Sequence, residues 1–293
     1  MRILNFGSLN IDHVFKVDHI VRDSETIACD DYSRFCGGKG LNQSIALARA
    51  GATVWHAGLI GEDGESLRSC LADAGVNTNY VEMVSGASGQ AVIQIDQHGE
   101  NCIIVNGGSN RKVEANYIST VIKSFAPGDW LLLQNEINAI PAIIKAARAN
   151  GMKIAFNPSP MQEAVLEYPL EAVNLFIVNE IEAAVLCGND GLPPNMVLQR
   201  IAKRYPQATI VMTLGANGVM CWHDGEMISH PAIKVTAVDT TAAGDTFTGF
   251  FLAEILRSSS LACALDIGTR AAAICVTQQG AASSIPHMDM VQR

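Results

Sequence analysis

Short β-like runs alternate with helix-like segments along most of this chain of 293 residues. The runs are RILNFG, VWHAGLIG, DWLLLQ, MKIAFNP, AVNLFIVNE and ATIVMTLG, and segments such as NAIPAIIKAARANG separate them. Parallel strands need long crossover connections, which are usually helices, so this order predicts a mostly parallel central sheet covered by helices on both faces. We expect an α/β fold with three layers, an α/β/α sandwich.

The ends of the predicted strands carry polar residues or glycine. In sheets of this kind, ligands bind beyond the carboxyl ends of the strands. The first candidates for chemistry are therefore the residues that end or follow these runs: Asn10, Glu136, Asn157, Asn179 and Gly215.

Two segments interrupt the alternation. HVFKV and TIACDDYSRF follow each other without a helix, and QAVIQID and NCIIVN flank the loop QHGE, which is typical of a β-hairpin. We expect these four runs to form a small sheet that acts as a lid. It would be inserted as two pieces, at about 12–37 and 89–108, into one domain spanning residues 1–293. The alternative is an extension of the edge of the main sheet.

Composition narrows the possible partners and the compartment. The net charge is −9 and neither sign forms a block, so we expect no binding to nucleic acid or to an anionic membrane. No apolar run is long enough to span a bilayer, and the first residues do not look like a signal peptide. The eight cysteines are scattered, without zinc-site spacing, and are expected to be reduced. These features predict a cytoplasmic protein.

A glycine cluster opens a predicted helix in GGKGLNQSIALARAG, from Gly37 to Gly51. Glycine lets a backbone approach a ligand closely, and Lys39 and Asn42 lie three residues apart, on one side of the first turn. The pattern does not match the phosphate-binding P-loop, and a dinucleotide fingerprint is absent. Taken alone, a glycine-rich helix start is weak evidence for function.

A second helix start, TTAAGD, places Asp245 directly after Ala242, Ala243 and Gly244. Side chains this small leave the backbone N–H groups at the start of the helix uncovered, and these groups attract anions. Two interpretations remain open on spacing alone. Asp245 is either an N-cap of the helix or a base that accepts a proton while the bare amides stabilise a transferring phosphoryl group.

These two motifs resemble, in order and separation, the two signatures of the ribokinase (PfkB) family of carbohydrate kinases. The similarity runs from GSLNID to QQGAASSIP, and Asn10, Asp12 and Gln43 make it greatest to the ribokinases of that family. The resemblance implies a ribokinase-like fold. It also implies ATP-dependent phosphorylation of the primary hydroxyl of a small sugar, with ribose the first candidate.

The resemblance assigns roles to residues at both ends of this reaction. Asp245 matches the general base, and Ala242, Ala243 and Gly244 match the anion hole. A polyol needs closely spaced donors and acceptors, which the matching sugar positions supply. These sugar positions are Asn10, Asp12, Gly38, Lys39, Asn42 and Glu136.

The resemblance also implies a nucleotide site with Mg²⁺ and a monovalent cation, usually K⁺. Asn179 and Glu182 match positions near the phosphates and the magnesium shell, although a helix-capping pair is the alternative. Thr213, Gly215 and Gly218 match the loop under the nucleotide, and Thr269 stands where ribokinases often have His. Ala242 replaces a more common Gly. The positions matching the cation ligands are Asp239, Thr241, Cys275, Gln278, Gly280 and Ser284.

Three other functions are alternatives to a sugar kinase. A nucleoside kinase needs an apolar pocket for the base, and a sugar-phosphate kinase needs more cations than Lys39 near the sugar. A sugar-sensing binding protein would not need Asp245, Asn179 or Glu182. Because the strands of a lid have unpaired edges, we also expect a homodimer formed through the lid.

Overall fold

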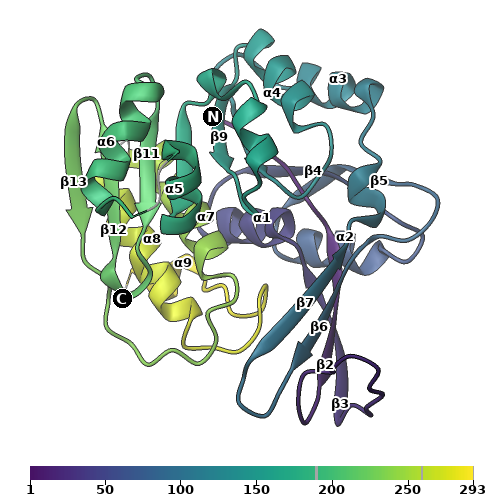
Figure 1. The fold of residues 1–293 in the computed structure, drawn as a ribbon. Helices are drawn as coiled ribbons and strands as arrows, with labels where there is room; N and C mark the ends of the chain where they lie inside the picture. Colours follow the sequence, from purple (N-terminus) through teal and green to yellow (C-terminus); the bar gives the residue numbers. More distant parts are fainter. Residues whose placement is uncertain (189–190, 259, 293) are drawn as a thin grey trace.

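The main body is built on one large twisted sheet. The computed structural model describes residues 1–188, 191–258 and 260–292. Among these residues the large sheet has nine strands, which run parallel except for the second strand from one edge, which is antiparallel to both of its neighbours (Figure 1). In spatial order they are β13 (Glu226–His230), β12 (Val219–His223), β11 (Thr209–Thr213), β10 (Leu175–Asn179), β9 (Lys153–Asn157), β8 (Trp130–Gln134), β1 (Ile3–Phe6), β4 (Val54–Ile60) and β5 (Asn77–Met83).

Helices cover both faces of this sheet, which confirms the predicted three layers. Successive side chains of a strand point to opposite faces. In β8, Leu131 and Leu133 therefore join one buried core while Trp130 and Leu132 join the other. The first core is closed by α3 (Ala115–Lys123), α4 (Ile140–Ala149), α5 (Glu180–Cys187) and α6 (Pro194–Arg204), and the second by α1 (Lys39–Arg49), α2 (Glu65–Asp73), α7 (Ala243–Ser258), α8 (Leu261–Cys275) and α9 (Met288–Val291).

Short 3₁₀ helices and one edge strand complete the body. The 3₁₀ helices are η1 (Gly108–Arg111), η2 (Glu163–Glu167), η3 (Leu170–Ala172) and η4 (Gly215–Asn217). Sequence reasoning did not find β5, whose run NTNYVEM lacks the apolar character of the inner strands because it lies at the sheet edge and is only partly buried. No helix in the described ranges has both the length and the apolar character needed to cross a membrane.

A separate four-stranded sheet projects from the body (Figure 1). Its order among the described residues is β3 (Asp31–Gly37), β2 (Asn10–Lys16), β6 (Gly89–Ile95) and β7 (Asn101–Asn106). The antiparallel pairing of β6 with β7 confirms the predicted hairpin. The run TIACDDYSRF is a strand only from Asp31 onward. The edge-extension alternative is wrong, because these strands pair with one another, and Asn10 pairs with both Gly37 and Gly89 at the base of the sheet.

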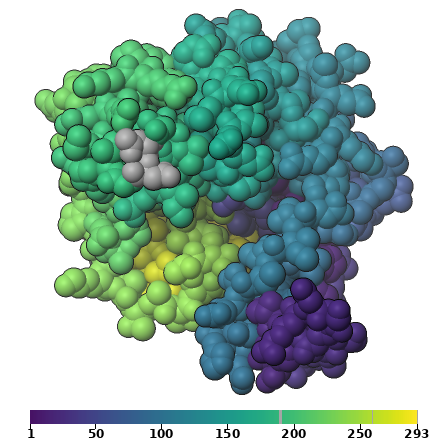
Figure 2. Space-filling view, in the orientation of Figure 1, coloured from purple at the N-terminus to yellow at the C-terminus, as the bar shows by residue number. Residues whose placement is uncertain are grey.

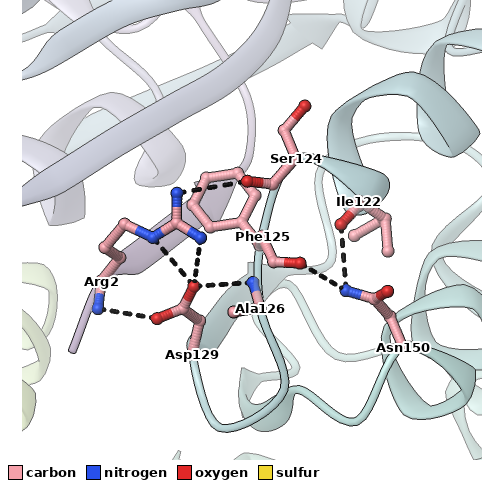
Figure 3. A network of polar contacts seen from close by, with 7 residues as sticks. All are labelled: Arg2, Ile122, Ser124, Phe125, Ala126, Asp129 and Asn150. Atoms are coloured by element: carbon pink, nitrogen blue, oxygen red, sulfur yellow. Dashed lines mark hydrogen bonds and ion pairs between the residues drawn. The ribbon is translucent and has the colours of Figure 1, made fainter.

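The N-terminal strand is fastened to the loop before β8 by Arg2 (Figure 3). Its backbone N–H and its Nε donate to the two carboxylate oxygens of Asp129, at 3.0 and 2.9 Å, and its guanidinium lies 4.8 Å from the centre of the Phe125 ring. Asn150 donates to the carbonyl oxygens of Phe125 and Ile122 from the end of α4. These contacts support the pairing of β1 with β8 in the centre of the sheet.

Helices α1 and α7 cross at very short range, at Gly249. A Cβ atom at this position would lie 2.8 Å from the backbone nitrogen of Leu47 and still closer to the Cβ of Ala46. Only glycine permits this approach. The crossing sets the start of α7 beside the start of α1, where both glycine-rich motifs lie.

We expect Gly249→Ala to lower the free energy of unfolding by about 1–3 kcal/mol, because the added methyl group meets the backbone of α1. In an uncrowded helix the same change stabilises by about 1 kcal/mol. Urea unfolding measures the difference.

Gly268→Ala in α8 is the matched control for this prediction. Its nearest atoms are those of the Phe247 ring, at 3.0 Å, and the Phe247 carbonyl oxygen, at 3.2 Å, so the overlap is smaller than at Gly249. Gly268→Ala should lower the free energy of unfolding by less than about 1 kcal/mol. Equal losses in the two variants would contradict the role given to the α1–α7 crossing.

Candidate active site

A cleft of about 540 Å³ lies between the small sheet and the carboxyl ends of the central strands. Figure 2 looks onto the recess between the small sheet, at the lower right, and the C-terminal part of the chain, at the lower left. Three isoleucine and valine side chains of the small sheet, Ile93, Ile103 and Val105, line one side. Thirteen of the predicted site residues line the cleft: Asn10, Asp12, Gly38, Lys39, Asn42, Glu136, Asn179, Glu182, Thr213, Thr241, Ala242, Gly244 and Asp245.

Asp245 is buried in the first turn of α7, with only 6% of its surface exposed. It is the third residue of the helix, and its carboxylate accepts hydrogen bonds from another helix. Asn42 Nδ2 donates to Oδ2 at 3.0 Å and Gln43 Nε2 donates to Oδ1 at 2.8 Å. The N-cap interpretation of Asp245 is therefore wrong. Asn42, which was expected to face a sugar, uses its amide nitrogen to hold this carboxylate.

The start of α7 presents backbone amides toward the cleft. Ala242 has a φ of 61°, a left-handed conformation that costs about 1–2 kcal/mol for a residue with a Cβ, which explains why glycine is the easier choice there. The amide of Ala243 donates to the Thr240 carbonyl, at 3.3 Å, and the amide of Thr246 donates to the Ala242 carbonyl. Helix geometry leaves the amides of Gly244 and Asp245 without an intrahelical acceptor, at the positive end of the helix dipole.

A second polar cluster lies where β1 and β8 end. Glu136 Oε2 accepts from Ser8 Oγ at 2.5 Å and from the backbone N–H of Lys39 at 2.9 Å. Asn110 Nδ2 donates to Asn10 Oδ1 at 2.7 Å, so the amide nitrogen of Asn10 stays available. Sequence reasoning missed Ser8 and Asn110. Ser8 lies in the GSLNID segment, but Asn110 is a hundred residues from its partner and gives no local signal.

The charges of this cluster strongly affect one another. Burial, and then the nearby carboxylate of Glu136, raise the pKa of Asp12 to about 7. Burial likewise raises the pKa of Glu136, although Lys39 opposes it. Burial disfavours the ammonium of Lys39, but the carboxylates of Asp245, Glu136 and Glu182 prevail and raise its pKa. Lys39 is thus a charged centre shared by the two ends of the cleft.

Three of the six predicted nucleotide residues, Asn179, Glu182 and Thr213, line the cleft. Asn179 and Glu182 form the capping box of α5: Asn179 Oδ1 accepts from the Glu182 amide at 2.8 Å, and Glu182 Oε2 accepts from the Asn179 amide at 3.0 Å. Asn179 and Glu182 thus form the helix-capping pair that was the alternative to a nucleotide role, and both side chains also line the cleft. Thr213 ends β11 and also lines it. Gly215 and Gly218 form the turn that follows, and Thr269 is buried on α8.

The six predicted cation positions are gathered around two loops. Asp239 accepts from the amides of Thr241 and Gly280, both at 2.9 Å, and these bonds outweigh burial and lower its pKa. Cys275 Sγ contacts Ser284 Oγ at 3.1 Å and donates to the Thr241 carbonyl. Gln278 donates its backbone N–H to the Cys275 carbonyl.

These loops offer carboxylate, hydroxyl and carbonyl oxygens, the donors that a hard cation prefers. Cys275 turns its thiol to neighbouring oxygens, so only its backbone carbonyl could serve as such a donor. In the described part of the chain no cluster of three or more His, Cys, Asp or Glu could hold a metal ion. The donor set therefore fits a cation held largely by backbone and hydroxyl oxygens.

Comparison with known proteins agrees with this fold. The chain is 34% identical over 287 residues to the ribokinase of Haemophilus influenzae, a match that covers 96% of this chain and 94% of that protein. Among solved structures, the ribokinase of Cryptococcus neoformans var. grubii in complex with ADP has a TM-score of 0.85 at 34% identity, covering 99% of this chain and 98% of that one.

A second solved structure, Arabidopsis thaliana ribokinase complexed with ribose and ATP, has a TM-score of 0.87 at 27% identity and covers 99% and 97% of the two chains. These likenesses confirm the predicted ribokinase-like fold. Residues 2–288 match the model of the pfkB family carbohydrate kinases. With its full-length relatives, this match shows that the chain belongs to the pfkB family of carbohydrate kinases.

Proposed function

We propose that this enzyme transfers the γ-phosphoryl group of ATP to the primary hydroxyl of a small sugar, and that the sugar is ribose. The observation that carries the proposal is the buried carboxylate of Asp245, held beside the bare amides of α7 inside the cleft. The similarity to a ribokinase complexed with ribose and ATP supports the choice of both substrates.

The polar cluster at the end of β1 suits a sugar. Asn10, Asp12 and Lys39 offer donors and acceptors in a small space, as a polyol requires. Gly38, at the start of α1, has a φ of 93° that only glycine adopts readily, and this exposes backbone next to the cluster. A sugar that lacks one hydroxyl would leave a buried protein group unpaired, which is the physical basis for discrimination.

Asp245 would act as the general base. The sugar hydroxyl gives its proton to the carboxylate as its oxygen forms a bond to the γ-phosphorus, and the bond from that phosphorus to the bridging oxygen breaks to release ADP. General-base help of this kind contributes about 10² to 10⁴ in rate. The amides of Gly244 and Asp245 would stabilise the charge on the transferring group, because they are fixed before the reaction begins.

The nucleotide would lie against the carboxyl ends of β10 and β11. Asn179, Glu182 and Thr213 would face the phosphates, with Gly215, Gly218 and Thr269 further along the nucleotide. When bound there with the phosphates, Mg²⁺ supplies charge neutralisation. The 239–241 and 275–284 loops would hold K⁺, and they brace the segment that leads into α7.

The small sheet would serve as the lid of a single kinase domain, inserted at about residues 12–37 and 89–108. Its apolar residues Ile93, Ile103 and Val105 face a cleft that otherwise carries many polar groups. Closure would exclude water, which competes with the sugar as phosphoryl acceptor.

The lid is also the proposed surface of a homodimer. The edge strand β7 leaves Ile104 exposed by 64%, on the face of the small sheet opposite to the cleft-lining Ile103 and Val105. A second lid would cover this apolar edge. We expect sedimentation at micromolar concentration to give twice the mass of the chain, and a monomer at that concentration would contradict this interface.

Steady-state assays with ATP and a panel of ribose, deoxyribose, fructose and adenosine test the substrate assignment. We expect the highest kcat/KM for ribose, and a lower rate when K⁺ is replaced by a large organic cation. Preference for adenosine would instead assign the cleft to a nucleoside, and equal rates in both salts would remove the cation from the proposal.

Asp245→Asn tests the base. The amide keeps the shape of the carboxylate but cannot accept the proton, so turnover should fall by about 10² to 10⁴ while ribose affinity changes little. Isothermal titration gives the affinity. Asp224→Asn is the matched control, because Asp224 lies in an exposed turn with 89% of its side chain accessible. Near-normal turnover in Asp245→Asn would reject the base assignment.

A further inference from the structure

Gln43, directly after Asn42 in α1, is fully buried and donates Nε2 to Asp245 at 2.8 Å and to Asn157 Oδ1 at 3.1 Å. We propose that Gln43 is a positioning residue for the base, and that Gln134 and Asn5 fix the direction of its hydrogen bond. The proposal rests on the base role of Asp245 given above. Of these three residues, none lines the cleft, so their effect must pass through Asp245.

The side-chain amides of Asn5, Gln134 and Gln43 form a chain of hydrogen bonds, and the direction of these bonds is set at Asn5. Asn5 Nδ2 donates to the backbone carbonyl of Gly40 at 2.7 Å, and a carbonyl can only accept. Asn5 therefore turns Oδ1 toward Gln134, which must present Nε2 to it, at 3.0 Å. The other hydrogen of Gln134 Nε2 goes to Gln43 Oε1, at 2.6 Å.

With its oxygen occupied in this way, Gln43 can only turn its nitrogen toward Asp245. An ionised carboxylate is an acceptor at both oxygens, so the chain matches the ionised form of the base and not a flipped amide. A glutamine free to rotate would place its oxygen against the carboxylate about as easily. The Gly40 carbonyl, at one end of the hydrogen-bond chain, thus determines that Gln43 presents its amide nitrogen to Asp245 at the other end.

The chain continues to a neutral histidine. Asn5 Nδ2 also donates to Ser44 Oγ at 2.8 Å, and Ser44 Oγ lies 2.8 Å from His56 Nδ1. Complete burial lowers the pKa of His56 to about 3, so its ring stays uncharged. The Ser44 hydroxyl has two acceptor lone pairs, so it can accept from Asn5 with either tautomer of the His56 ring. This leaves Ser44 an acceptor toward Asn5, in agreement with the direction set by Gly40.

Such a chain is costly in the interior. Asn5, Gln43, Ser44 and His56 have no exposed surface and Gln134 has 1%. Gln134 Oε1 is buried without a hydrogen-bond partner among the described residues. An unpartnered buried oxygen destabilises the folded state, and apolar side chains of similar shape would avoid this. Retention of the chain is explained if its hydrogen-bond direction serves the base.

Other charged and titratable groups also act on Asp245, and the experiment leaves all of them in place. They are Lys39 on α1, Glu136 after β8 and Cys275 on α8.

The experiment compares Gln43→Met and Gln134→Met in the full chain, with ribose and ATP, by single-turnover kinetics. Methionine keeps the length of glutamine without its hydrogen bonds. For Gln43→Met we expect the transfer rate to fall about ten- to a hundredfold, with ribose affinity changed less than about twofold. Removing a donor from the ionised base should also move the acidic limb of the pH–rate profile upward by on the order of one unit. Gln134→Met should change the transfer rate and the acidic limb in the same directions, but by smaller amounts than Gln43→Met.

Three controls separate this role from a structural one. Gln207→Met, at a glutamine that does not line the cleft and donates to the carbonyls of Glu171 and Val173, should leave the kinetics unchanged. Adding Gln43→Met to Asp245→Asn should change the residual rate less than about twofold, because the residue acts through the base. If Gln43→Met fails to fold, Gln43→Glu keeps its shape and should move the acidic limb further, through repulsion.

The outcomes distinguish the two proposals. Loss of turnover in Asp245→Asn together with an unchanged rate and pH profile in Gln43→Met would overturn the positioning role alone. If adding Gln43→Met lowered the transfer rate by the same factor in the unmodified enzyme and in Asp245→Asn, the positioning role would be overturned too. Normal turnover in Asp245→Asn would instead remove the base, and with it the proposed mechanism.

Discussion

The contact between the starts of α1 and α7 is the interaction on which the active site depends. A carboxylate buried like that of Asp245 needs donors, because desolvation otherwise disfavours its charge. The donors Asn42 and Gln43 come from a helix about two hundred residues earlier in the chain, and they reach it because Gly249 lets the two backbones nearly touch. One packing contact thus places both the base and the bare amides of α7 in the cleft.

The same crossing explains how the cleft holds so many charges of one sign. Asp245, Glu136 and Glu182 face a single ammonium, that of Lys39, whose pKa they raise. Backbone and hydroxyl donors such as Ser8 supply the remaining stabilisation. Such a site can bind a neutral polyol, because each buried carboxylate can accept a hydrogen bond from a hydroxyl group. The polarity of the cleft and the apolar residues of the small sheet are complementary parts of the proposed sugar site.

Much of this could be inferred from the chain itself. The apolar strands, the hairpin of the small sheet and the family carried by the two glycine-rich motifs were all predicted, since they depend on local pattern. The failures were of two kinds. The edge strand β5 lacks the apolar run of an inner strand. The partners of Asn42, Asn10 and Gln134 lie far along the chain, where spacing carries no signal.

The amino-acid sequence by itself determined the order of elements, the family, and the presence of an acid at a bare helix start. Periodicity and small side chains act locally, so they can be read without a fold. Only the tertiary structure decided that Asp245 is held from across the core and is not an N-cap, and that Asn179 and Glu182 cap their own helix. It also decided which way the amides behind the base point. A hydrogen-bond direction depends on every partner at once, and those partners meet only when the chain is folded.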